Sequence, residues 1–82
     1  MRTFKKKFVP MQSTAVELTI GKNKIKVQFD KLKRVCSVKK ILEDESLETI
    51  PTLWYRIIGR NFINIAELRF IIYDELDRLE ML

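Results

Sequence analysis

The alternation of apolar and polar residues is clearest between Thr14 and Phe29, where it predicts a β-hairpin. Six apolar residues occupy every second position on either side of a turn: Val16, Leu18, Ile20, Ile25, Val27 and Phe29. A turn closed at Lys22-Asn23 pairs Ile20 with Ile25, Leu18 with Val27 and Val16 with Phe29. All six side chains then share one face, and a slip of one residue would break the match. The opposite face is basic and tolerates water, with Thr19, Lys24, Lys26 and Gln28.

A helical period replaces the alternation after Asn64 and predicts an amphipathic helix from about Ile65 that can run to the C-terminus. Asn64 and Glu67 have the spacing of a capping box, with Asn in place of Ser or Thr. One apolar sector of this helix should face the core: Ile65, Leu68, Ile72, Leu76, Leu79 and Leu82. A second apolar stripe lies on the opposite side, formed by Phe70, Tyr73 and Met81. This stripe needs a cover, either the N-terminal arm or a second subunit.

Residues 31 to 44 fit a helix with Asp30 as its N-cap. Its apolar side would be formed by residues at helical spacing: Leu32, Val35, Val38 or Lys39, and Leu42. Ser37 could instead cap a second, shorter helix over 38–44. The acidic residues 43–45 oppose the dipole at a helix C-terminus, so the helix should fray there and give way to a loop over 46–51.

Residues 52 to 65 allow two interpretations. A helix over 53–58 is possible, capped by Thr52 and ended by Gly59. We favour a second hairpin, because β-branched and aromatic residues dominate 54–58 and a turn at 59–61 leads to a return strand over 62–65. The sequence at 58–61, Ile-Gly-Arg-Asn, also echoes Ile-Gly-Lys-Asn at 20–23, which would make the chain a tandem ββα unit. In this arrangement Trp54, the single Trp of the chain, should anchor the core.

Together these segments predict one small α+β domain over residues 14–82, ordered as β-hairpin, helix, β-hairpin and long C-terminal helix. Residues 1–13 would form a basic N-terminal arm, in which Pro10 stops a regular strand. Because 82 residues enclose only a small core, we expect self-association to contribute to stability. The high Lys, Glu and Ile content resembles thermophile usage.

The composition also narrows the cellular setting. With one Cys and no His, the chain cannot form an internal disulfide or a Cys/His zinc site. Cys36 is expected to be a small buried apolar residue in a reducing compartment. No apolar run approaches the roughly 20 residues that span a bilayer, and the basic N-terminus lacks the apolar part of a secretion signal. We therefore expect a cytoplasmic protein without a membrane partner.

The residues needed for catalysis are missing from the sequence. Without His, and with a single isolated Cys, the usual pairs of nucleophile and base cannot form. The segment Gly21-Lys22-Asn23-Lys24 is too short and too basic for a nucleotide-binding phosphate loop. An acidic run could hold a hard cation but is more typical of a solvated loop: Glu43, Asp44, Glu45 and Glu48. We expect no enzyme activity, no cofactor, no metal and no small-molecule substrate.

The charge is divided unevenly along the chain. Residues 1–42 contain twelve Lys and Arg against two acidic residues, whereas residues 43–82 contain four against nine. The basic half indicates a surface for phosphates. Its expected contacts are Lys5, Lys6, Lys7, Lys22, Lys24, Lys26 and Lys33, with Arg34 and Arg60 in addition. The first hypothesis is therefore a non-catalytic regulatory protein that binds nucleic acid, with DNA as the expected ligand. The sequence contains no residue pattern for reading bases, so it does not predict sequence-specific binding.

The alternative hypothesis is a protein interaction module. The stripe formed by Phe70, Tyr73 and Met81 could join two copies in a homodimer, or dock the chain on a partner as an adaptor or inhibitor. The two hypotheses are compatible, because a homodimer would double the basic footprint on nucleic acid.

Overall fold

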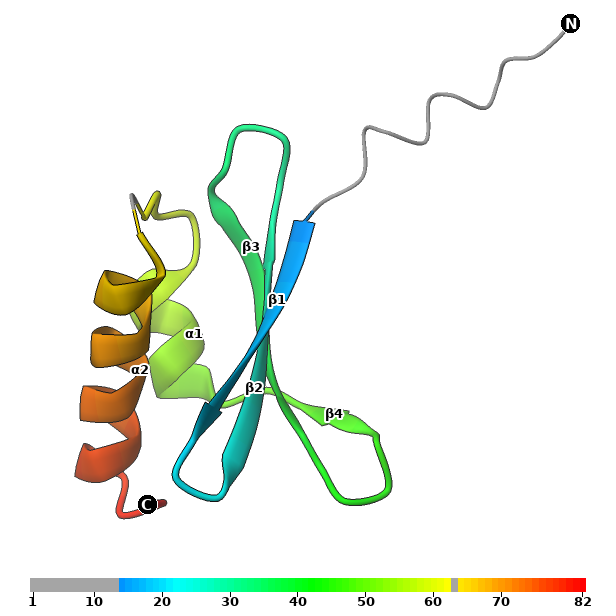
Figure 1. The fold of residues 1–82 in the computed structure, drawn as a ribbon, viewed down its shortest axis with the longest axis vertical. Coiled ribbons are helices and arrows are strands. Elements are labelled where there is room, and N and C mark those ends of the chain that lie inside the picture. The colour runs from blue at the N-terminus through cyan, green and yellow to red at the C-terminus, as the bar shows by residue number, and fades with distance from the viewer. Residues whose placement is uncertain (1–13, 63) are drawn as a thin grey trace, which may run out of the picture.

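The computed structural model describes residues 14–62 and 64–82, which form a four-stranded antiparallel sheet with two helices on one face (Figure 1). The strands lie in chain order: β1 (Thr14–Ile20), β2 (Asn23–Phe29), β3 (Val35–Ile41) and β4 (Leu47–Glu48). They are followed by α1 (Pro51–Ile57) and α2 (Ile65–Arg78). The predicted α+β class is confirmed, although the elements between residues 31 and 58 differ from the prediction. The predicted arm over residues 1–13 lies outside the described residues.

β1 and β2 form the predicted hairpin with a register shifted by two residues. Ile20 pairs with Asn23, so the turn consists of Gly21 and Lys22 instead of Lys22 and Asn23. Gly21 has a φ of 63°, a value that the first position of a type II′ turn requires and that glycine adopts without strain. The pairs are Leu18 with Ile25, Val16 with Val27 and Thr14 with Phe29. Because the shift is an even number of residues, the predicted apolar face is preserved.

Residues 35–41 form strand β3, so the predicted helix over 31–44 is wrong. β3 pairs antiparallel with β2, and the register shifts between Gln28 and Phe29. Cys36 is the extra residue of this β-bulge. The bulge places Val35 and Val38, three positions apart, on the buried face, and this spacing imitates a helix in the sequence. Cys36 is exposed, contrary to the expectation of a buried residue.

Residues 51–57 form helix α1, so the predicted second hairpin and the tandem ββα repeat are wrong. Pro51 starts the helix, at a position where a missing N–H has no partner to lose. Leu53 and Ile57, one turn apart, are completely buried. The alternative of a helix in this segment is therefore correct, although Ile50 and not Thr52 occupies the N-cap.

Trp54 is not the core anchor that the sequence suggested. Its side chain is 39% exposed on the outer side of α1, and the neighbouring Tyr55 is 81% exposed. The two rings stack with their centroids 6.2 Å apart. The core position on this helix belongs to Leu53, which has no exposed surface.

Helix α2 begins as predicted. Asn64 is its N-cap, and the side-chain oxygen of Asn64 accepts a hydrogen bond from the Glu67 N–H at 2.9 Å. The middle of the predicted core stripe is confirmed, because Leu68, Ile72 and Leu76 are completely buried. The ends of that stripe remain between 37% and 40% exposed: Ile65, Leu79 and Leu82.

The end of α2 is tied to the first hairpin. The helix stops at Arg78 because Glu80 takes a φ of 58° and the Met81 N–H donates to the Leu76 carbonyl at 2.9 Å, as in a Schellman motif. The buried Asn23 then donates its side-chain N–H to the Met81 carbonyl at 2.9 Å. Met81 packs against the core, so its predicted place in an exposed stripe is wrong.

The core lies between the helices and one face of the sheet, with α2 against β1 and α1 against β3. Among the described residues, twelve buried apolar side chains form it: Leu18, Ile20, Ile25, Val27, Val35, Val38, Ile50, Leu53, Ile57, Leu68, Ile72 and Leu76. The two helices are also joined by Arg56, whose guanidinium lies 2.8 Å from a Glu75 carboxylate oxygen and 2.9 Å from an Asp74 oxygen. Glu75 is only 2% exposed, so a buried carboxylate is neutralised at the helix interface.

Candidate nucleic-acid interface

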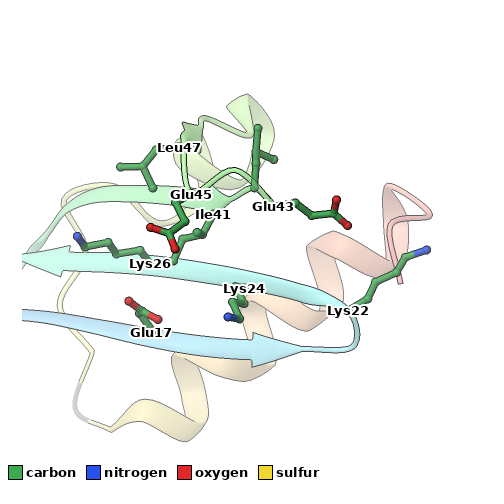
Figure 2. Close-up of a pocket in the computed structure, with 9 residues that line it drawn as sticks. Glu17, Lys22, Lys24, Lys26, Ile41, Glu43, Glu45 and Leu47 are labelled. Atoms are coloured by element: carbon green, nitrogen blue, oxygen red, sulfur yellow. The ribbon is translucent and has the colours of Figure 1, made fainter.

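The sheet face turned away from the helices carries basic residues from two adjacent strands. Side chains alternate along a strand, so Lys24 and Lys26 point away from the buried residues of β2. Lys39 of β3 lies opposite Lys26, and Glu17 of β1 lies opposite Lys26 on its other side. Figure 2 shows Lys24, Lys26 and Glu17 on this open face. We refer to Lys24, Lys26 and Lys39 as the lysine cluster.

The lysine cluster concentrates positive charge without compensation by ion pairs. Within residues 14–62 and 64–82, the ion pairs join Arg34 to Asp30, and Arg56 to Asp74 and Glu75. None of them includes a residue of the lysine cluster. Like charges directly opposite each other on neighbouring strands destabilise a sheet, so the pairing of Lys26 with Lys39 is unfavourable for the fold alone.

A groove of about 610 Å³ borders the lysine cluster (Figure 2). Its floor is the first hairpin, with Lys22, Lys24, Lys26 and Glu17, and its other side is formed by the end of β3 and the β3–β4 loop. The residues from that side are Ile41, Leu42, Glu43, Glu45 and Leu47. The predicted residues Lys22, Lys24 and Lys26 are thus brought together, beside an acidic loop that the sequence did not place there.

The β3–β4 loop has a defined conformation. The Glu45 N–H donates to the Leu42 carbonyl at 2.8 Å, and the Leu42 N–H donates to the Ser46 carbonyl at 2.9 Å. Asp44 accepts from the Ser46 hydroxyl at 2.6 Å and from the Ser46 N–H at 3.0 Å. These two bonds, the hydroxyl first, lower the pKa of Asp44. Its carboxylate is occupied within the loop, so Glu43 and Glu45 remain to face the groove.

A second basic group lies in the β2–β3 loop. Asp30 does not cap a helix there; its side chain accepts from the N–H groups of Leu32 at 2.9 Å and of Arg34 at 3.0 Å. The Arg34 N–H is the main cause of the lowered pKa of Asp30. The Arg34 side chain also pairs with Asp30. Lys33 takes a φ of 65°, a conformation that few residues other than glycine adopt without strain.

The predicted contacts Lys33, Arg34 and Arg60 are neighbours at this end of the sheet. Asn61 donates its side-chain N–H to the carbonyls of Leu32 and Lys33, at 3.1 and 3.2 Å, which holds the 59–61 segment against the β2–β3 loop. Arg60 is exposed and lies 5.1 Å from the centre of the Phe62 ring. The site residues predicted from the sequence therefore form two groups, one around the groove and one in this loop. Lys5, Lys6 and Lys7 lie outside the described residues.

Lys39 belongs to the lysine cluster but is not among the phosphate contacts expected from the sequence. The sequence predicts a helix over 31–44, in which Lys39 has no relation to Lys26. Residues 37–41, Ser-Val-Lys-Lys-Ile, do not alternate between apolar and polar, and the bulge at Cys36 separates the buried Val35 and Val38 by three positions, so the two-residue period of a strand is hidden.

The predicted partner stripe on α2 is exposed in part. Phe70 is 69% exposed and Tyr73 is 51% exposed, one turn apart on the outer side of the helix. The exposed aromatic residues Trp54 and Tyr55 lie on α1. All four belong to the helical layer, so none of them borders the lysine cluster.

The described part of the chain holds no group of three or more acidic or Cys side chains placed to bind a metal ion. None of its helices has the length and apolar character needed to span a bilayer. Comparison of the chain with models of protein families, with curated proteins and with solved structures finds no match.

Proposed function

We propose that the chain binds nucleic acid through the open face of its sheet, by contacts to phosphates and without catalysis. The observation that carries this proposal is the lysine cluster. Lys26 and Lys39 lie side by side on adjacent strands, with Lys24 two positions along β2. Glu17 lies opposite Lys26 on β1, but none of the described ion pairs includes a residue of the lysine cluster. An arrangement that is unfavourable for the free protein becomes favourable when an anionic polymer neutralises it.

Other basic residues lie at both ends of the sheet. Lys22 lines the groove at the β1–β2 turn, beside Glu17, Glu43 and Glu45, and Lys33 lies in the β2–β3 loop at the opposite end. A net charge of +5 attracts a polyanion before contact is made. The acidic residues of α2 lie in the other layer, so they do not repel a ligand on the open face.

The chemistry of this face favours the backbone of a duplex, with DNA as the proposed ligand. Proteins that prefer single strands present aromatic side chains on which bases stack. The exposed aromatic residues among the described ones, such as Trp54 and Phe70, belong to the helices. Lysines alone neutralise phosphates without reading base edges, so we expect little sequence preference and a regulatory or architectural role.

A binding titration with a labelled DNA duplex at several salt concentrations tests the proposal. Each lysine that contacts a phosphate contributes about 0.9 to the slope of log K against log salt concentration. Lys26→Gln should weaken binding and lower this slope by about 1. Arg78→Gln removes the same charge from the exposed end of α2 and serves as the matched control. Equal effects of the two substitutions, or no binding at low salt, would contradict the proposal.

A second candidate function is partner binding through α2. It is favoured by the exposure of Phe70 and Tyr73 on adjacent turns of one helix, since large exposed apolar groups often mark an interaction site. Met81 does not take part, because it packs on the core. Replacing Phe70 and Tyr73 by Ser should abolish such binding and leave the DNA titration unchanged.

A further inference from the structure

The two edges of the sheet differ in how their backbone groups are covered. On the β3 side, the Gly59 N–H donates to the Val35 carbonyl at 2.7 Å and the Val35 N–H donates to the Arg60 carbonyl at 2.9 Å, while β4 pairs with the far end of the strand. On the outer edge of β1, opposite to β2, no described residue pairs with the strand. Among the described side chains, the Arg69 guanidinium covers the last part of this edge by donating to the Thr19 carbonyl at 3.2 Å.

The geometry of the hairpin determines which groups β1 presents at this edge. A two-residue turn makes Ile20 and Asn23 a hydrogen-bonded pair, and such pairs alternate with non-hydrogen-bonded ones along the strand. The N–H and C=O groups of Ala15, Glu17 and Thr19 therefore point away from β2. The bond from Arg69 to the Thr19 carbonyl agrees with this direction. Within residues 14–62 and 64–82, no partner is present for these outward backbone groups of Ala15 and Glu17, so they can bind another strand.

We propose that a second copy of the chain occupies this edge, with the two β1 strands antiparallel about a two-fold axis at Val16. Ala15 of each copy then pairs with Glu17 of the other, which forms four backbone hydrogen bonds. The half-buried Val16 of one copy faces Val16 of the other. The two sheets become one continuous sheet, and both lysine clusters lie on the same side of it.

For a second copy, the residues of β1 favour this register. An axis at Glu17 would place two carboxylates opposite each other, which is unfavourable, and an axis at Leu18 would require the Thr19 carbonyl that Arg69 occupies. With the axis at Val16, each Glu17 carboxylate faces the small neutral Ala15. Natural free edges are protected by charged side chains, Pro or a bulge, whereas Thr14–Ile20 contains no Pro, no bulge and a single charged residue, Glu17.

The mass of the full chain in solution gives the first test. Sedimentation equilibrium over a wide concentration range should show a species of twice the 9.8 kDa monomer mass. Ala15→Pro removes an N–H that faces the second copy and that β2 does not use, so it should return the protein to the monomer with an unchanged circular dichroism spectrum. Ala15→Ser keeps the N–H and should remain a dimer. A wild-type chain that is monomeric at all concentrations overturns the proposal.

Disulfide trapping gives a second test that does not depend on a disruptive variant. In a Cys36→Ser background, Val16→Cys should cross-link rapidly, because Cα atoms of a non-hydrogen-bonded antiparallel pair lie about 4.5 Å apart, within the range of a disulfide. Glu17→Cys in the same background, and the exposed Cys36 of the wild type, should cross-link slowly. Faster cross-linking of either control overturns the register. A dimer that survives Ala15→Pro and is lost on replacing Phe70 and Tyr73 places the interface on α2 and overturns the proposal.

Discussion

The ion pairs of Arg56 provide a test of how burial determines the strength of an interaction in this fold. One guanidinium nitrogen lies 2.8 Å from Glu75 and 2.9 Å from Asp74, so the two bonds have nearly the same length. The side chain of Glu75 is 3% exposed, whereas that of Asp74 is 43% exposed. Glu75→Gln and Asp74→Asn each replace a carboxylate that pairs with Arg56 by a neutral amide. The two substitutions are therefore matched in chemistry and differ in the burial of the side chain.

The two substitutions should lower the free energy of unfolding by different amounts, because solvent screens the exposed Asp74 carboxylate but not the buried Glu75 carboxylate. A hydrogen bond to a charged group contributes roughly 1.5–3 kcal/mol, whereas an exposed ion pair contributes about 0–1 kcal/mol. Because Arg56 is itself partly exposed, we expect Glu75→Gln to cost about 2 kcal/mol, in the lower part of that range. In a domain of this size, 1 kcal/mol changes the Tm by roughly 4–8 °C. Asp74→Asn should lower the Tm by only a few degrees.

The effect of Glu75→Gln should also depend on pH. The Thr52 side chain, and then the Arg56 guanidinium, hold the pKa of Glu75 below its ordinary value of 4.5, against the effect of burial. A carboxyl group with a lowered pKa in the folded state stabilises the fold above its unfolded pKa, and this contribution is lost as the pH falls through the folded pKa. The gap in stability between the wild type and Glu75→Gln should therefore be complete at neutral pH and shrink as the solution is acidified below the ordinary pKa of the group.

Urea denaturation of the three proteins at neutral and acid pH measures both effects. A double-mutant cycle with Arg56→Met isolates each pair. Equal destabilisation by Glu75→Gln and Asp74→Asn would refute the argument from burial. A gap that stays constant on acidification would refute the assignment of the lowered pKa to Glu75.

Two further predictions concern packing and the C-terminal contact, and both can be measured by thermal denaturation. Asn23→Ala leaves the part-buried Met81 carbonyl without its donor, so it should lower the free energy of unfolding by about 1–3 kcal/mol. Asn23→Ser keeps a polar group and should lower it by less. Equal Tm values for the two variants would contradict the role of the bond. Leu53→Ala should lower the free energy of unfolding by about 2–5 kcal/mol because Leu53 is completely buried. Trp54→Ala should lower it by clearly less. The reverse order would show that Trp54 is the core anchor.

The sequence predicted those elements in which local and tertiary signals agree. In the first hairpin, the two-residue period identified the buried face, but not the register, because the turn residues Gly21-Lys22-Asn23 allow two closures that differ by an even number of residues. For α2, the helical period and the Asn64 cap pointed to the same start. The helix end was missed because Glu80 adopts a positive φ without being glycine.

The middle of the chain could not be predicted by the same rules. The bulge at Cys36 changes the phase of β3, so that Val35 and Val38 share a face at a spacing typical of a helix. In α1, β-branched and aromatic residues favour a strand locally, but burial of Leu53 and Ile57 against the sheet determines the outcome. As a result, the sequence predicts a helix for the basic residues of 31–40. The pairing of Lys39 with Lys26 required the strand.

The hydrogen bond between Asn23 and Met81 has a consequence for the synthesis of the protein. It joins residues 58 positions apart, so the ribosome completes the first hairpin long before the acceptor for its Asn23 amide has been made. During this interval the apolar side of the nascent hairpin has no helix over it, and chains with such exposed surfaces are prone to aggregate. The yield of native protein should therefore depend on how fast the codons of α2 are translated and on whether a chaperone shields the hairpin. A fold that is held together by local contacts should depend less on either factor.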